Sequence, residues 1–89
     1  MKTIYKKILP EYFEAVASGK KNFELRLNDF AIEEGDTLEL REWDAKTKHY
    51  TGRTLSRTVS YVARFKLDQL FWPEEEVKEK GIQIIALHE

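Results

Sequence analysis

The sequence predicts a small, mainly β domain of the α+β class, a curled sheet or partly open barrel with one or two short helices. Its 89 residues suffice for one modest hydrophobic core, so we expect a single domain over residues 1–89. Four or five short segments alternate apolar and polar side chains with the period of a β-strand. One segment instead has the apolar spacing of a helix, and a glycine follows it.

The first strand is expected at about Thr3–Leu9, followed by a helix over Pro10–Ser18. Proline suits the first helical position, where its missing N–H has no intrahelical partner. Glutamates near the start of this segment favour the positive end of a helix. Gly19 then fits the left-handed position after the last helical residue. The helix therefore has a start signal, an end signal and an apolar stripe made of Tyr12, Phe13, Val16 and Ala17.

A second strand is expected over Asn22–Asn28, with Phe23, Leu25 and Leu27 facing the core. The opposite face then displays Glu24 and Arg26 side by side, and Lys20 and Lys21 lie immediately before the strand begins. Four charged groups in so short a stretch are typical of a binding site. The alternative is a solvated strand face with a surface salt bridge.

The middle of the chain reads as a β-meander. Gly35-Asp36 is a turn signal, and a strand is expected over Thr37–Trp43. A polar hairpin loop over Asp44–Gly52 leads to a return strand over Arg53–Val62. On that return strand the hydroxyl-bearing residues share one face, which we expect to face solvent or to line a site: Thr54, Ser56, Thr58 and Ser60.

The last quarter begins with apolar residues that we expect to cover an open barrel end: Leu67, Leu70, Phe71 and Trp72. The acidic run after Pro73 and the lysines that follow it obey the charge rules of a short exposed helix. A final buried strand is expected from the alternation near the C-terminus, with inward positions Ile82, Ile84, Ile85 and Leu87.

Composition excludes several classes of site. The chain has no cysteine, so disulfides, thiol nucleophiles and cysteine zinc sites are ruled out. His49 and His88 are far apart and lack ligand spacing, so we expect no metal and no cofactor. No apolar run is long enough to span a membrane, and the charged N-terminal residues lack an apolar signal core. We therefore expect a cytoplasmic protein that does not bind a membrane.

Charge is segregated along the chain, although the net charge is only −1. Residues 1–26 and 41–66 carry an excess of Lys and Arg, whereas 27–40 and 67–89 carry an excess of acidic residues. If the two basic blocks pair in the fold, they make a cationic surface that attracts phosphates. If blocks of opposite sign pair across the sheet, the charges cancel.

Four motifs in order resemble the ASCH-like branch of the PUA-like superfamily. They are Pro10-Glu11-Tyr12-Phe13, then Gly19-Lys20-Lys21-x-Phe23-Glu24-x-Arg26-x-Asn28-Asp29, then Gly35-Asp36-x-Leu38-x-Leu40-Arg41-Glu42-Trp43-Asp44, and Tyr50-Thr51-Gly52-Arg53. The chain is similar to small, uncharacterised bacterial and phage single-domain proteins of that branch over about residues 6–62. The resemblance implies a PUA-like pseudo-β-barrel with a helix at one rim. It also implies a cleft beside that helix that holds Gly19, Lys21, Glu24 and Arg26.

The superfamily is associated with RNA binding and with modified-nucleoside chemistry, so the first function expected is an RNA- or nucleotide-binding module. Lysines and arginines would hold phosphates, Trp43 and Tyr50 would stack an unpaired base, and Glu24 and Arg26 would read its edge. The alternative for Trp43 and Tyr50 is packing against the hairpin. The residues expected to contact the ligand are Lys7, Lys20, Lys21, Glu24, Arg26, Asn28, Arg41, Trp43, Tyr50 and Arg53. We expect Lys21, Glu24 and Arg26 to share a concave surface with Arg41 or Trp43.

The second function is an amidohydrolase that acts on an acylated nucleoside such as N4-acetylcytidine. One ASCH-like subfamily uses a lysine, a threonine three residues on and a distant glutamate. Lys21 occupies the lysine position here, but the threonine position holds Glu24. Lys21 and Glu24 would be catalytic only if burial shifted both toward their neutral forms, whereas an ion pair holds both charged. We therefore favour binding over catalysis.

Overall fold

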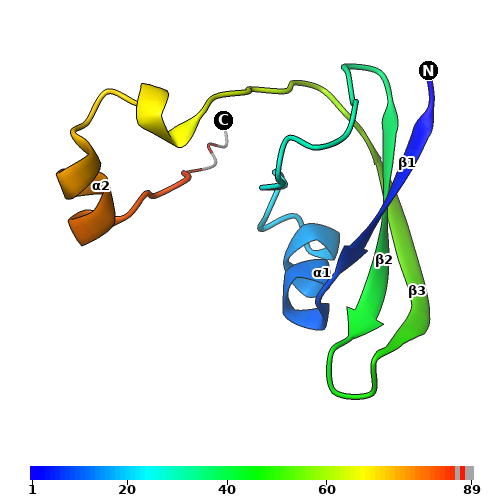
Figure 1. Ribbon diagram of the computed structural model, residues 1–89. Coiled ribbons are helices and arrows are strands. Elements are labelled where there is room, and N and C mark those ends of the chain that lie inside the picture. The colour runs from blue at the N-terminus through cyan, green and yellow to red at the C-terminus, as the bar shows by residue number, and fades with distance from the viewer. Residues whose placement is uncertain (86, 88–89) are drawn as a thin grey trace.

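The computed structural model describes residues 1–85 and Leu87, and His88 lies outside them. These residues form β1 (Thr3–Ile8), α1 (Pro10–Ala17), β2 (Thr37–Asp44), β3 (His49–Thr58), the 3-10 turn η1 (Leu67–Gln69) and α2 (Glu74–Lys80) (Figure 1). The helix predicted after Pro10 is confirmed: Pro10 is its first residue, and Gly19 follows with φ +82°.

The strands form a three-stranded sheet in the order β1-β2-β3. β1 runs parallel to β2, and β2 runs antiparallel to β3. A parallel pair needs a long crossover, which α1 and the loop after it supply, whereas a tight turn joins β2 to β3. The α+β class is confirmed. In the described residues the sheet is open, with β1 and β3 at its edges, and a barrel is not shown.

The core lies between α1 and one face of the sheet. Strand alternation points Ile8 and Leu40 toward the helix, and helical spacing points Phe13 and Val16 back at them. All four side chains are buried, and Leu40 is the most completely buried at 1% exposure. Leu38 and Leu55 pack at the margin of this cluster. The opposite face of the sheet remains uncovered by α1 (Figure 1).

The turn before β2 is held by the buried carboxylate of Asp36. Its two oxygens accept hydrogen bonds from the backbone N–H groups of Glu33 and Lys2, at 2.9 and 3.1 Å. These bonds favour the charged carboxylate and lower the pKa of Asp36. Asp36 thereby ties the start of β1 to the turn that begins β2.

The return strand differs from its predicted range. β3 begins at His49 and ends at Thr58, four residues before the predicted Arg53–Val62 at each end, so the hairpin loop is only 45–48. The cause is a β-bulge: Arg41 pairs with Thr54 but Trp43 pairs with Tyr50. Residues 51–53 of β3 therefore lie opposite the single residue Glu42. Gly52 allows the backbone to bend there, because its φ of +96° is a conformation that glycine adopts without strain.

The prediction of a strand over Asn22–Asn28 is wrong. This segment forms no strand in the structure, and Leu25 and Leu27 are exposed rather than buried. Glu24 is instead the more enclosed side chain, with 14% of it exposed. The physical reason is that the charged side chains of this segment bond to one another and to the edge of β1, which turns the polar face inward.

The predictions for the last quarter are also partly wrong. Residues 82–85 and Leu87 form no strand, and the isoleucines there are 45–71% exposed. Three of the residues expected to cover a barrel end are exposed too, namely Leu67, Trp72 and most of all Phe71, whereas Leu70 is partly buried. The short helix is confirmed as α2, which is exposed and carries ion pairs from Lys78 to Glu74 and from Lys80 to Glu76. We call residues 59–85 the C-terminal arm; Figure 1 shows it leading away from the sheet.

Candidate functional site

A pocket of about 520 Å³ lies where the end of β1, helix α1 and the 21–26 segment meet. We call it the α1 pocket. The left-handed turn at Gly19 reverses the chain after α1, and the Lys21 N–H then donates to the Ala15 carbonyl oxygen at 2.9 Å. This bond sets the 21–26 segment against the helix. The pocket is lined by Lys7, Ile8, Leu9, Tyr12, Lys21, Phe23, Glu24, Leu25 and Arg26.

Three charged side chains converge in the α1 pocket. Lys21 Nζ lies 2.7 Å from Glu24 Oε1, and Arg26 Nη2 lies 2.9 Å from Glu24 Oε2. Arg26 Nη2 also donates to the Lys7 carbonyl oxygen at 2.6 Å, on the free edge of β1. Two cations thus share one carboxylate, so the cluster carries a net positive charge. The predicted close approach of Lys21, Glu24 and Arg26 is confirmed.

Aromatic rings flank the lysine of this cluster. Lys21 Nζ lies 5.3 Å from the ring centroids of both Tyr12 and Phe23, within the range of a cation–π contact. Tyr12 is about half exposed, so its ring also borders the open side of the pocket. The α1 pocket therefore combines flat apolar surfaces with convergent charges, which is the usual composition of a small-molecule site.

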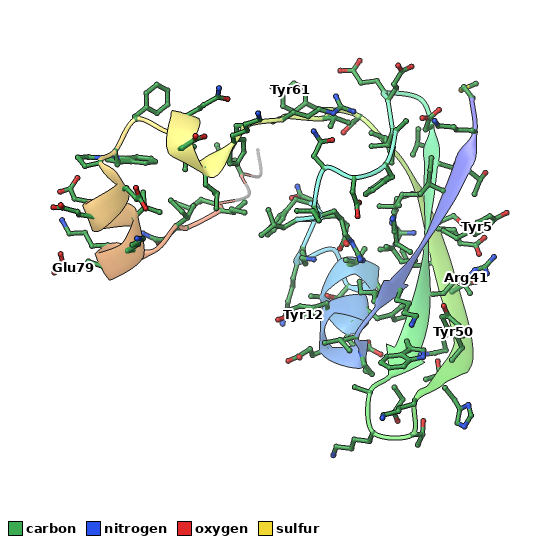
Figure 2. All side chains as sticks on the ribbon, in the orientation of Figure 1. Tyr5, Tyr12, Arg41, Tyr50, Tyr61 and Glu79 are labelled. Atoms are coloured by element: carbon green, nitrogen blue, oxygen red, sulfur yellow. The ribbon has the colours of Figure 1, made fainter. Side chains whose placement is uncertain are left out.

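Arg41, Trp43 and Tyr50 do not belong to this pocket. They lie on the face of the sheet opposite α1, because their strand positions alternate with the core residue Leu40. Figure 2 shows Arg41 and Tyr50 projecting on the side of the sheet away from α1. The expectation that Arg41 or Trp43 shares a concave surface with Glu24 is therefore wrong. Lys7 bridges the two regions, since it lines the pocket and its Nζ lies 4.4 Å from the Trp43 ring centroid.

Arg53 does not line the α1 pocket but forms hydrogen bonds and ion pairs with two glutamates. It donates from Nε and Nη2 to the two carboxylate oxygens of Glu42, at 2.9 and 2.6 Å, and it contacts Glu14 on α1. The hydroxyl of Thr51 also donates to Glu42, at 2.6 Å. The bonds from Arg53 and Thr51 lower the pKa of Glu42 to about 2, while Glu42 and Glu14 raise the pKa of Arg53. These bonds link α1 to the sheet.

The remaining predicted ligand contacts lie outside the pocket lining. Lys20 is exposed on the turn after α1, and Asn28 is exposed beyond the 21–26 segment. Sequence reasoning assigned Tyr12 to the buried stripe of α1 and so missed its place beside Lys21. No signal in the sequence locates that contact, because it depends on how the chain reverses at Gly19. Tyr5 lies on the face of the sheet opposite α1 and is absent from the expected ligand contacts, although its alternation with Ile4 and Lys6 indicates that face.

Within residues 1–85 and 87, no three of the side chains that ligate metals gather closely enough to hold an ion. Over the same part of the chain, no helix is long and apolar enough to cross a membrane.

Comparison with known proteins gives a family match over residues 5–71, to the family described as "Domain of unknown function (DUF3850)". The chain belongs to this family. The matched range runs from β1 to just past η1, so it contains every residue of the α1 pocket and ends before α2.

The chain is also similar to the "Uncharacterized 12.9 kDa protein in GpA 3'region" of Escherichia phage P2. The two are 37% identical over 71 residues, which is 80% of this chain. The chain spans only 60% of the length of that phage protein. No solved structure matches the chain.

Proposed function

We propose that this domain is an RNA- or nucleotide-binding module whose α1 pocket holds a nucleobase and its phosphate. The observation that supports it is the convergence of Lys21, Glu24 and Arg26 in a pocket of about 520 Å³, where Lys21 also lies beside the rings of Tyr12 and Phe23. That volume falls within the range typical of small-molecule sites, roughly 300–1,000 Å³.

Each part of the pocket suits one part of a nucleotide. Tyr12 and Phe23 offer flat apolar surface for a base, and base stacking on aromatic rings tolerates any base. Lys21 and Arg26 suit a phosphate, because hydrogen bonds between charged groups are strong and an arginine fork matches phosphate oxygens. Glu24 then orients both cations, and the second lone pair on each of its carboxylate oxygens can accept a hydrogen bond from an amino group on a base edge.

The second candidate is an amidohydrolase that acts on an acylated nucleoside such as N4-acetylcytidine. It is favoured by one observation, the direct contact between Lys21 and Glu24 inside a pocket. Against it, both carboxylate oxygens of Glu24 already accept hydrogen bonds, one from Lys21 and one from Arg26. A general base must accept a proton from the reacting group, so this ion-paired arrangement suits binding better than catalysis.

The placement of the domain in the ASCH-like branch of the PUA-like superfamily remains a proposal. We likewise propose that the sheet closes into a pseudo-barrel. The 22–28 and 82–85 segments contain alternating apolar residues, and neither segment is paired in a strand. We also keep the proposal that the protein acts in the cytoplasm.

The binding proposal is tested by measuring the affinity of nucleoside monophosphates for the parent protein, Lys21→Ala and Arg26→Ala. Each substitution removes a hydrogen bond to a charged group, worth about 1.5–3 kcal/mol, so affinity should fall roughly tenfold or more. Lys78→Ala is the matched control, since Lys78 is exposed on α2 and lies outside the pocket lining. Equal affinities in all four proteins would contradict the proposal.

Glu24→Gln separates the two candidate functions. A binder should tolerate it within about 1–2 kcal/mol, because the amide keeps the size and hydrogen-bonding capacity of the side chain. An enzyme that uses Glu24 as general base should lose roughly two to four orders of magnitude in rate. We expect tolerance and no turnover of N4-acetylcytidine by the parent. Turnover that both Lys21→Ala and Glu24→Gln abolish would promote the amidohydrolase.

A further inference from the structure

The face of the sheet opposite α1 is open and carries aromatic and cationic side chains. Its outward positions in β1 and β2 include Tyr5, Lys7, Arg41 and Trp43, and Tyr50 joins them from β3. Tyr5 and Tyr50 are each 54% exposed, and the side chain of Arg41 is 43% exposed. Among the described residues, no helix or loop covers this face (Figure 1). We call it the outer face.

The strand register places these groups along a track. Trp43 pairs directly with Tyr50 near the hairpin, and Arg41 lies two residues further along β2, beside Lys7. Tyr5 is opposite Glu39, four residues from Trp43, which is about 13 Å at the rise of a strand. Aromatic surface is therefore available at both ends of the track, with cations between.

The cations of the outer face sit beside its rings. Arg41 Cζ lies 4.0 Å from the centroid of the Tyr5 ring, and Lys7 Nζ lies 4.4 Å from that of Trp43. Glu39, the acidic residue on this face of β2, accepts a hydrogen bond from Arg41 Nε at 2.8 Å and so is already engaged. A base stacked on either ring would bring its phosphate close to a cation.

The third strand adds hydroxyl groups rather than apolar surface. Thr54, Ser56 and Thr58 are exposed and lie opposite the outward residues of β2. None of the outward residues of the three strands is aliphatic. Aromatic rings, cations and hydroxyls without aliphatic groups suit stacked bases and phosphates better than they suit the apolar centre of a protein interface.

The outer face and the α1 pocket meet at Lys7. The carbonyl oxygen of Lys7 accepts a hydrogen bond from Arg26 in the pocket, while its ammonium group lies over Trp43 on the outer face. A polynucleotide chain that leaves the pocket across the edge of β1 would thus reach Trp43 first, then Arg41, and then Tyr5.

We propose that the ligand is a single-stranded polynucleotide that places one base in the α1 pocket and stacks further bases along the outer face. This inference rests on the proposed function of the pocket and extends it from a mononucleotide to a chain. Trp43, Tyr50 and Tyr5 stack the bases, and Lys7 and Arg41 contact the phosphates between them.

The test compares the affinities of uridine monophosphate and of oligouridylates of increasing length, each as RNA and as its DNA equivalent. In the parent protein each base that gains a stacking partner should raise affinity at least roughly fivefold. In Tyr5→Thr and Tyr50→Thr this gain with length should shrink, with affinity for the monophosphate unchanged. Threonine retains strand propensity, and Tyr61→Thr is the matched control because Tyr61 is exposed on the C-terminal arm (Figure 2).

A second measurement does not depend on the tyrosine variants. Trp43 and Trp72 are the two tryptophans of the chain, so Trp72→Phe makes Trp43 the single emitter. Its fluorescence should change with an oligouridylate of four nucleotides but not with the monophosphate. RNA and DNA oligomers that behave alike indicate recognition by stacking and charge, whereas a preference for RNA adds recognition of the 2′-hydroxyl.

The outcomes separate the two proposals. Monophosphate binding that Arg26→Ala weakens, without any gain for longer oligomers, would overturn the outer-face track and leave the pocket function standing. A gain with length that both tyrosine variants retain would overturn the track as well. Failure of the monophosphate to bind would overturn the pocket function itself.

Discussion

Glu42 is the residue whose environment departs most from its sequence context. It is a carboxylate in a strand and yet is 97% removed from solvent, since its exposed fraction is 3%. The β-bulge makes this possible, because it brings both Thr51 and Arg53 opposite Glu42, where they donate three hydrogen bonds to it. A buried charge is tolerated only when it is paired and hydrogen-bonded in this way.

The lowered pKa of Glu42 predicts a component of acid sensitivity. Because its pKa is about 2 in the folded state against 4.5 for the free group, its stabilisation is fully present above about pH 4.5 and is lost as pH falls toward 2. Glu42→Gln should lower the melting temperature at neutral pH and flatten the pH dependence between these values. Thermal melts at several pH values measure both effects.

The pH-dependent melts of Glu42→Gln need a control variant and must allow for a second carboxylate with a lowered pKa. Glu34→Gln is the control, since Glu34 is an exposed glutamate in the turn before β2. Asp36, whose pKa is also lowered, leaves part of the acid sensitivity in place. If Glu42→Gln and the parent had parallel pH profiles, the ionisation of Glu42 would not contribute to the acid sensitivity of folding.

At the scale of single elements, α1 and β2 have the strongest sequence signals and are confirmed almost to the residue. Each has a periodic apolar set and a partner to bury it against. The 22–28 segment has an equally regular alternation and forms no strand. Alternation describes only which side chains share a face, and a strand also needs a neighbour to pair with.

The packing of α1 on β2 depends most on Leu40, which is the most deeply buried core side chain described. Leu40→Ala should cost about 2–5 kcal/mol of unfolding free energy, from lost burial and the cavity left behind. That is a large share of the roughly 5–15 kcal/mol that holds a typical domain folded. Urea unfolding followed by circular dichroism measures the loss.

Leu67→Ala is the matched control, because the same side chain is 69% exposed on η1. A surface change of this kind should shift stability within about 0.5 kcal/mol. Equal losses in the two variants would mean that η1 packs against the body in solution.

At the scale of the whole molecule, the C-terminal arm makes the chain more extended than a compact domain of the same length. The Cα radius of gyration is 15.0 Å, against about 12 Å expected for a compact chain of this length. The arm extends away from the sheet and exposes large apolar side chains, among them Phe65, Phe71 and Trp72. The core under α1 is correspondingly small.

Small-angle X-ray scattering tests this shape directly. An extended arm predicts a radius of gyration clearly above the compact value and rapid proteolysis between Val59 and Leu67, where the backbone forms no helix or strand. A dilution series controls for self-association. A compact value, with slow cleavage in this stretch, would show that the arm folds onto the sheet and would favour the closed barrel.

Local sequence signals are enough to predict the α+β class, the helix after Pro10, the strands β1 and β2, and the cluster of Lys21, Glu24 and Arg26. These follow from local periodicity, capping residues and short-range charge pairs, which act within a few residues. Long-range packing, in contrast, places Trp43 and Arg41 on the face of the sheet opposite the α1 pocket and pairs Arg53 with Glu42. Those placements depend on strand register and on a bulge, where one or two extra residues change which groups meet.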